Sequence, residues 1–246
     1  MLAKDDSGPG EPVVRRLNTL RRLSENGIAA IRAALRERPM KAAAGEDLIC
    51  EGDRCDNVRL FLSGWACRYK ALEDGRRQIL SFVLPGDTCD AYIYLLSAMD
   101  HSIATLTPVS FAELDRVAFE RLMSTDASVA EAFHCEILAA RAIQREWGIN
   151  LGRRDALERV AHMICELFER LKMVGLVDGN MFAFPVTQTD LADATGLSTV
   201  HLNRTLQELR AAGLITLRDR SLTILDLQAL RNAAMFNPSY LHQDRK

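Results

Sequence analysis

The stretch at residues 187–224 constrains the fold of this 246-residue chain more than any other. Thr187 can cap a short helix, and Gly196 follows it at a place where a tight turn needs a positive φ. Ser198 can cap a second helix, over Thr199 to Ala212, whose leucines share one face. The spacing therefore predicts a helix-turn-helix, in which two helices cross over a short turn.

A β-hairpin is predicted directly after the second helix. Gly213 ends that helix, and two short strand-like runs, Ile215–Arg218 and Ser221–Ile224, flank the dipeptide Asp219-Arg220. Two-residue connections are the commonest in hairpins. We interpret this hairpin as the wing of a winged helix-turn-helix domain, which we assign to residues 153–246.

The middle of the chain, at residues 40–126, has a different pattern. Short apolar runs such as Val58 to Leu62 and Gln78 to Leu84 alternate with turns that are rich in Gly and Asp. Strands of this length and spacing are typical of an all-β barrel or jelly roll.

A long helix is predicted between these two domains, at residues 127–152. Six residues in it recur at a 4-3-4-3-4 spacing and form a heptad pattern: Phe133, Ile137, Ala140, Gln144, Trp147 and Leu151. Such a pattern favours packing against an identical helix, so we expect a dimer seam. The alternative is an amphipathic helix that lies on its own sheet domain. A second helical pattern follows at residues 155–173.

The N-terminal residues 1–39 are predicted to hold a disordered leader, up to about residue 14, and a helical stretch from Val13 that ends before Pro39. The first ten residues are polar, unlike a signal peptide, and the apolar runs are too short to span a membrane. Hydrophobic residues make up 48%, charged residues 26%, and the net charge is −2. We therefore expect an α+β protein of the cytoplasm without membrane contact.

The helix-turn-helix also resembles a known family. From Thr187 to Leu209 the chain reads Thr-Gln-x-Asp-Leu-Ala-x-x-x-Gly-Leu-Ser-x-x-x-x-Asn-Arg-x-Leu-x-x-Leu, which is similar to the Crp/Fnr family of bacterial transcription regulators. Upstream glycines fall where the cyclic-nucleotide-binding-type barrel of that family turns: Gly45, Gly52, Gly64 and Gly86. The resemblance implies a homodimeric regulator that is not an enzyme. Its partners would be double-stranded DNA with a palindromic operator, and RNA polymerase.

The resemblance also assigns roles to side chains of the helix-turn-helix and the wing. Base edges are expected to be read by Thr199, Val200, Asn203 and Arg204. Arg204 can make two hydrogen bonds to guanine, whereas Val200 stands where well-known branches carry Glu, so we do not expect the usual half-site. Phosphate contacts are expected from Thr187, Gln188, Ser198, His201, Arg218 and Arg220.

The usual ligand-binding residues of the family are replaced in the sheet domain. Counted from Gly86, the Gly-Glu pair becomes Asp90-Ala91 and the Arg-Ser pair, which binds the phosphate of a cyclic nucleotide, becomes His101-Ser102. Without that arginine, cyclic AMP is not expected as a ligand. The first cysteine is Cys50, so the N-terminal iron–sulfur cluster of other relatives is not expected either. We predict no cofactor and no metal site.

The six cysteines are expected to be reduced and mostly buried. In the alternative, Cys50 and Cys55, with or without Cys67, form a redox or metal site. An effector- or redox-sensing ligand-binding module coupled to DNA binding therefore remains a second functional hypothesis. An enzyme is disfavoured, because the chain has no Gly-rich phosphate loop and no nucleophile motif.

Overall fold

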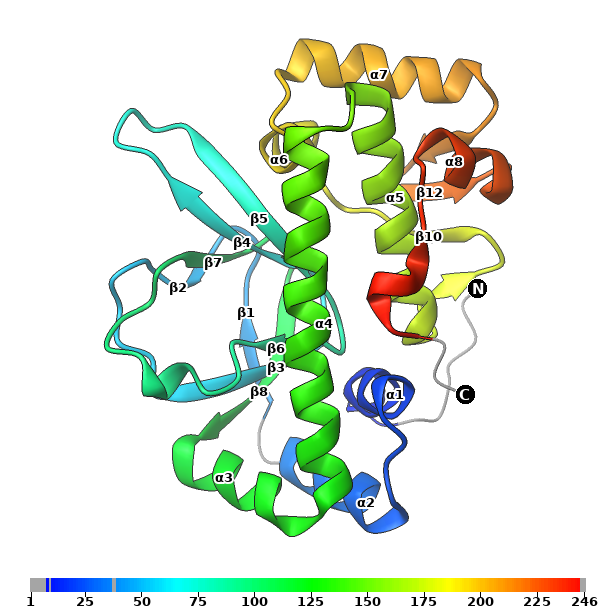
Figure 1. Cartoon of the computed structure of the whole chain (residues 1–246). Helices are drawn as coiled ribbons and strands as arrows, with labels where there is room; N and C mark the ends of the chain where they lie inside the picture. Colours follow the sequence, from blue (N-terminus) through cyan, green and yellow to red (C-terminus); the bar gives the residue numbers. More distant parts are fainter. Residues whose placement is uncertain (1–7, 9, 37–38, 244–246) are drawn as a thin grey trace.

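The structure is a computed structural model that describes residue 8, residues 10–36 and residues 39–243. Figure 1 shows a domain of strands on one side of the long helix α4 (Ala127–Gly152), with the helices labelled α5 and α8 of the C-terminal half on the opposite side. The predicted α+β fold, with jelly-roll-type sheets, a long helix and a winged helix-turn-helix, is confirmed. No helix in the described part of the chain is both long and apolar enough to span a membrane.

The N-terminal segment forms two helices, α1 (Glu11–Leu20) and α2 (Glu25–Arg36). The prediction of a leader up to residue 14 is wrong from Glu11 onward, because Val13 and Val14 are buried in the core; residues 1–7 and 9 lie outside the described part. Residues 21–24 separate the two helices of the predicted helical stretch. The hydroxyl of Ser24 donates to Asp126 Oδ2 over 2.6 Å and accepts from the backbone N–H of Gly27 in α2.

The sheet domain consists of two four-stranded antiparallel sheets, ordered β1-β8-β3-β6 and β2-β7-β4-β5. Their strands and one short 3-10 helix are β1 (Met40–Ala42), β2 (Asp47–Ile49), β3 (Asn57–Ser63), β4 (Ala66–Ala71), β5 (Arg77–Val83), β6 (Thr88–Cys89), η1 (Ile93–Leu95), β7 (Ser102–Thr105) and β8 (Val109–Asp115). Residues of both sheets share one apolar cluster, in which Phe61 stacks on Phe111. The sheets therefore bury their inner faces against each other.

Helix α3 (Arg116–Thr125) leads into α4, which lies against its own chain along part of the predicted dimer seam. Phe133 is fully buried against Phe119 of α3. Trp147 is also buried, and its indole N–H donates to Glu166. The assignment of Phe133 and Trp147 to a dimer seam is therefore corrected: α4 turns these two large rings inward, where they complete the core of their own chain.

The exposed stripe of α4 is displaced by one position from the predicted one. We define the free face of α4 by its exposed members at the same heptad spacing: His134, Leu138, Arg141, Arg145 and Gly148. Leu138 is 57% exposed, which is unusual for a leucine in the middle of a long helix. Of the other predicted seam residues, Ile137 and Ala140 are half-buried beside this face, and Gln144 and Leu151 are exposed.

The C-terminal half starts with α5 (Ala156–Met173), which is capped by Asp155 and Glu158. A small sheet, ordered β11-β12-β10-β9, holds the wing. The remaining elements are β9 (Val177–Asp178), β10 (Met181–Ala183), α6 (Gln188–Thr195), α7 (Thr199–Ala211), β11 (Ile215–Arg218), β12 (Ser221–Ile224), α8 (Leu227–Ala233) and η2 (Pro238–Leu241).

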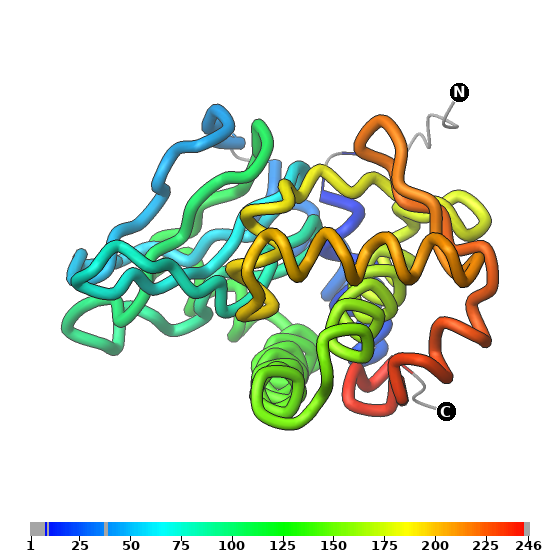
Figure 2. Tube along the Cα trace, turned by 90° about the horizontal axis from the view of Figure 1, so that it is seen from above, coloured from blue at the N-terminus to red at the C-terminus, as the bar shows by residue number. Residues whose placement is uncertain are grey.

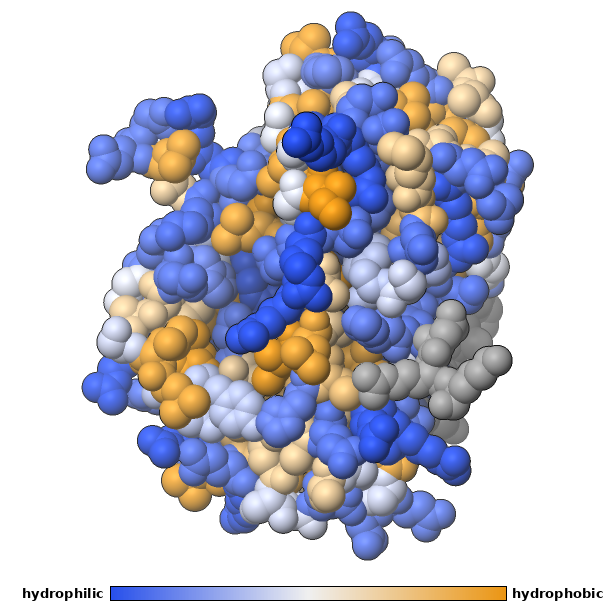
Figure 3. Space-filling view, viewed as in Figure 1, coloured by the Kyte–Doolittle hydropathy of each residue, from blue (hydrophilic) through white to orange (hydrophobic). Residues whose placement is uncertain are grey.

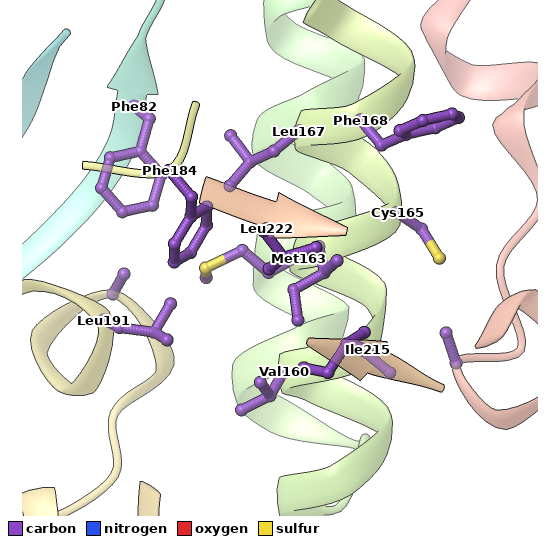
Figure 4. Packing of buried hydrophobic residues seen from close by; sticks show 14 of the residues in the cluster. Phe82, Val160, Met163, Cys165, Leu167, Phe168, Phe184, Leu191, Ile215 and Leu222 are labelled. Carbon is purple, nitrogen blue, oxygen red and sulfur yellow. The ribbon is translucent and has the colours of Figure 1, made fainter. Parts of the chain in front are cut away.

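One apolar core joins the two halves of the molecule. Figure 4 shows Phe82 of β5 and Phe184 beside Met163 of α5, with Leu222 of β12 in the same cluster. Side chains from the sheet domain and from the helix-turn-helix are thus buried together, so the position of one half depends on the packing of the other.

Candidate functional site

The helix-turn-helix is built by three local signals, all of which the sequence predicted. The hydroxyl of Thr187 accepts from the backbone N–H of Asp190 at the start of α6. Gly196 ends α6 with φ at 64°, and Ser198 caps α7 by accepting from the backbone N–H of His201. The leucines of α7 are buried, so the helix has one fixed inner face. Its other face is turned outward.

The four predicted base-reading residues lie at the N-terminal end of α7. Val200 is 79% exposed, Thr199 and Arg204 are exposed, and Asn203 is half-buried. The guanidinium of Arg204 lies 3.7 Å from a carboxylate oxygen of Glu208, and its side chain is 68% exposed. Seen along α4, α7 crosses the end of the molecule at its outer surface (Figure 2). A helix held in this way can enter a major groove.

The predicted phosphate contacts lie around this helix. Thr187, Gln188 and Ser198 are exposed at the N-termini of α6 and α7, where backbone N–H groups favour anions. His201 is half-buried on α7. Arg218 and Arg220 are exposed in the wing, whose turn places Asp219 and Arg220 at φ of 49° and 58°, as a two-residue hairpin requires.

Two arginines that the sequence analysis did not single out hold α6 in place. Arg77 of β5 lies 2.5 Å from Asp190 and 2.8 Å from Asp193, both in α6. Arg159 of α5 donates to the carbonyl oxygen of Thr195, the last residue of α6. These contacts join segments that are far apart in the sequence, so no local pattern could have found them.

A cavity of about 410 Å³ lies between the sheet domain and α4. Its lining includes nine Asp, Glu, His and Arg side chains: Arg16, Arg68, Asp87, Asp90, Asp100, His101, Glu136, Arg141 and Arg170. Counting from Gly86 predicts that His101 belongs to the ligand site, and the structure places His101 in the lining of the cavity. Its Nε2 lies 3.3 Å from Asp90 Oδ2. Arg68, which comes from β4, was not predicted from the sequence.

The buried charges of the cavity are arranged in pairs. Arg170 Nη2 donates to Asp87 Oδ2 over 2.6 Å, and Arg16 of α1 lies 3.2 Å from the other oxygen of Asp87. Burial alone would raise the pKa of Asp87, but the charges of Arg170 and Arg16 lower it below its usual value. Glu136 is different, because burial raises its pKa to about 6 despite Arg16 nearby.

The cysteines do not form a cluster in the described part of the chain. Cys50 is exposed, whereas Cys55, Cys67, Cys89 and Cys165 are buried. No group of three His, Cys, Asp or Glu side chains within the described residues is arranged to hold a metal ion.

The sheet domain with its cavity and the exposed recognition helix together define a class, the DNA-binding regulators with a cyclic-nucleotide-binding-like domain. The cyclic nucleotide-binding domain family matches residues 39–126, and the Crp-like helix-turn-helix domain family matches residues 158–233. The chain belongs to the Crp/Fnr family of transcription regulators.

Relatives in this family are transcription regulators. The nitrogen fixation regulation protein FixK of Azorhizobium caulinodans is 30% identical over 197 residues, which cover 78% of this chain and 77% of that protein. The transcriptional activator protein FnrL of Cereibacter sphaeroides is 28% identical over 180 residues, 72% of each chain.

Solved structures share the fold. FixK2 from Bradyrhizobium japonicum has a TM-score of 0.70 at 26% identity, over 80% of this chain and 96% of that one. A CRP-family transcriptional regulator from Thermus thermophilus has a TM-score of 0.62 at 21% identity, over 80% and 97% of the two chains.

Proposed function

We propose that this chain is a cytoplasmic, homodimeric transcription regulator that binds a palindromic operator without cyclic AMP, and that it acts with RNA polymerase. The observation that carries the proposal is the outward-facing α7, with Val200, Arg204 and Thr199 exposed at its N-terminal end. Two such helices about one duplex turn apart (roughly 34 Å) would read the two half-sites of a palindrome.

The free face of α4 supports the homodimer. Its exposed residues lie along one side of α4, and Leu138 gives this side an exposed apolar centre that an identical helix can cover. In Figure 3, hydrophobic side chains alternate with strongly hydrophilic ones along the middle of the face that α4 presents. Leu138 would lie in the apolar centre of the interface, and Arg141 and Arg145 would lie toward its edges.

The cavity supports a sensor that does not bind cyclic AMP. Arg68 is paired with Asp90, whose Oδ2 lies 3.3 Å from Arg68 Nε, so this arginine of the sheet domain is not free to bind the phosphate of a cyclic nucleotide. A redox signal through the buried thiols is also disfavoured. Burial raises the pKa of Cys67, Cys89 and Cys165 to about 12, so little reactive thiolate is present at neutral pH.

The decisive experiment is the selection of bound sequences from a random DNA pool, with and without a mild oxidant. We expect a palindromic site that is selected equally under both conditions and in the absence of any nucleotide. Because Val200 can make only apolar contacts, for instance with a thymine methyl group, the selected half-site should differ from that of relatives with Glu. Failure to enrich any sequence would contradict the proposal.

A second candidate function is an effector-sensing module coupled to DNA binding. The cavity of about 410 Å³ favours it, since this volume is large enough for a small ligand. Calorimetric titration with cyclic AMP and with cyclic GMP separates the two hypotheses. We expect no heat of binding with either nucleotide, and micromolar binding of one of them would favour the effector hypothesis.

A further inference from the structure

Arg68 is a cation at the cavity, and each of its three guanidinium nitrogens donates one hydrogen bond to the chain itself. Its side chain is 17% exposed. Nη1 donates to Ser81 Oγ over 3.3 Å, Nη2 donates to the carbonyl oxygen of Thr88 over 3.0 Å, and Nε donates to Asp90 Oδ2 over 3.3 Å. A guanidinium presents its donors in a rigid fork that suits an anion. Here the carboxylate of Asp90 is that anion.

A second side chain that can carry a positive charge, the imidazole of His101, faces the same carboxylate. Nε2 of His101 lies 3.3 Å from Asp90 Oδ2, and Nδ1 of His101 lies 2.7 Å from Asp100. Burial alone would raise the pKa of Asp90, but Arg68 and His101 lower it to about 2. The pKa of His101 is raised, because its contacts with Asp90 and Asp100 outweigh the effect of burial. Asp90 is thus held ionised between an arginine and a histidine.

The backbone that carries Asp90 adopts a conformation that side chains rarely tolerate. Asp90 and Tyr92 both have positive φ, at 51° and 66°. Such conformations persist where surrounding contacts enforce them, and they gather at ligand-binding sites. Asp90, the first residue of this loop, is also the residue whose carboxylate contacts Arg68 and His101.

The same loop reaches the free face of α4. The ring of Tyr92 stacks on His134, with the ring centroids 6.2 Å apart, and its hydroxyl lies 3.3 Å from His134 Nε2. His134 is the first exposed residue of that face. The position of Asp90 therefore affects how Tyr92 packs against α4, the helix that we assign to the dimer.

We propose that Asp90 is an internal ligand: its carboxylate fills an anion site made by Arg68 and His101, and so replaces a diffusible effector. The site takes a small carboxylate when the side chain of Asp90 is removed. The filled site orders the loop at residues 90–92 against α4 and leaves the DNA-binding form independent of added ligand. The statement that DNA binding is independent of added ligand rests on the function proposed above.

The test is chemical rescue of the Asp90→Gly variant. Glycine adopts the positive φ of this position without strain, and the substitution removes one acetate-sized group. In sodium chloride we expect the variant to bind the selected operator roughly tenfold more weakly than the wild type, a typical coupling between two sites. Sodium acetate at equal ionic strength should restore operator binding and raise the melting temperature of the variant, and it should change neither property of the wild type.

Two matched variants test whether the loss of operator affinity is caused by the loss of the Asp90 carboxylate. Asp90→Asn keeps the shape and removes the charge, so it should lose operator affinity like the glycine variant, but acetate should not rescue it because no space is available. Asp56→Asn removes a 63% exposed carboxylate that pairs with the exposed Arg54 and does not line the cavity, and its operator affinity should stay within about twofold of the wild type, as expected for an exposed pair.

Each result of these experiments either supports or overturns the proposal. Operator binding by Asp90→Gly at wild-type strength in chloride would overturn the proposal, and so would a loss that acetate does not restore. If the glycine variant fails to fold in chloride, refolding that requires acetate and not chloride supports the site, and equal failure in both salts overturns it. The melting temperatures are measured without DNA. If the wild type bound no operator, the proposed function would fail while the acetate effect could still be observed.

Discussion

The guanidinium of Arg77 lies 2.5 Å from a carboxylate oxygen of Asp190, and this contact joins strand β5 of the sheet domain to the first helix of the helix-turn-helix. Asp190 also accepts the hydroxyl proton of Thr187 in a 2.6 Å hydrogen bond, so the N-terminal cap of α6 and the contact between the domains share one carboxylate. A change at Arg77 therefore reaches the DNA-binding surface without altering a residue that we expect to contact DNA.

We predict that Arg77→Ala weakens operator binding without changing the preferred sequence. The pair is largely buried, so its loss should also cost about 1 kcal/mol of unfolding free energy. Urea unfolding and binding to the selected operator measure the two effects. The control is Arg76→Ala, because the side chain of Arg76 is 76% exposed and pairs only within its own turn. Equal effects of both substitutions would contradict a positioning role for Arg77.

Arg204→Ala is predicted to cost about 1–3 kcal/mol of specific binding and to relax one base position in each half-site. The reason is the loss of a two-hydrogen-bond contact to guanine. Arg220→Ala, in the wing, should weaken binding to all sequences similarly, because phosphates carry no sequence information. Binding to a panel of single-base operator variants distinguishes the two results, and an unchanged base preference for Arg204→Ala would remove α7 as the reading helix.

Leu138→Glu is predicted to produce monomers that bind the operator much more weakly. A charge at this position would be buried in the dimer without a partner, which is strongly unfavourable. Sedimentation shows the oligomeric state. Val117→Glu is the matched control, because Val117 is a 72% exposed apolar residue of another helix, α3. A wild-type protein that sediments as a monomer, both with and without DNA, would contradict the prediction.

A charge at Trp147 is expected to have a different effect from a charge at Leu138. It packs in a T-shaped contact against Phe82, with the ring centroids 6.0 Å apart, and is only 3% exposed. A charge introduced at Trp147 should therefore destabilise the fold itself, as large changes in a packed core do. Thermal unfolding of Trp147→Glu should show a clearly lower melting temperature than that of Leu138→Glu, and equal melting temperatures would contradict this placement.

The pH dependence of stability is predicted to involve Glu136. Burial raises its pKa from 4.5 to about 6, so the folded state binds more protons than the unfolded state between these two values. Stability from this group therefore falls as the pH rises from about 4.5 to 6, by about 2 kcal/mol in total, and the penalty persists above pH 6. In urea unfolding at pH 5 and pH 7.5, Glu136→Gln should show a smaller loss between the two pH values than the wild type. The same loss in both proteins would falsify the assignment.

The sequence by itself determined the parts of the fold that depend on neighbouring residues. The caps at Thr187 and Ser198 and the turn at Gly196 are set by hydrogen bonds and backbone freedom within three or four residues, so a single sequence is enough to predict them. The alternation of short apolar runs with Gly and Asp turns likewise predicted the antiparallel sheets. The family resemblance and the local sequence pattern predicted the same helix-turn-helix, because both depend on the same interactions between neighbouring residues.

Only the tertiary structure decided which face of a helix is free and which charges meet. The apolar heptad spacing of α4 predicted a stripe that contains Phe133 and Trp147, but these two residues pack on α3 and α5 of their own chain, and the adjacent stripe of Leu138 is the exposed one. Asp90 and Arg68 are 22 residues apart in the sequence, and Arg77 and Asp190 are 113 apart. Attraction between charges depends on distance in space, and the folded core sets that distance.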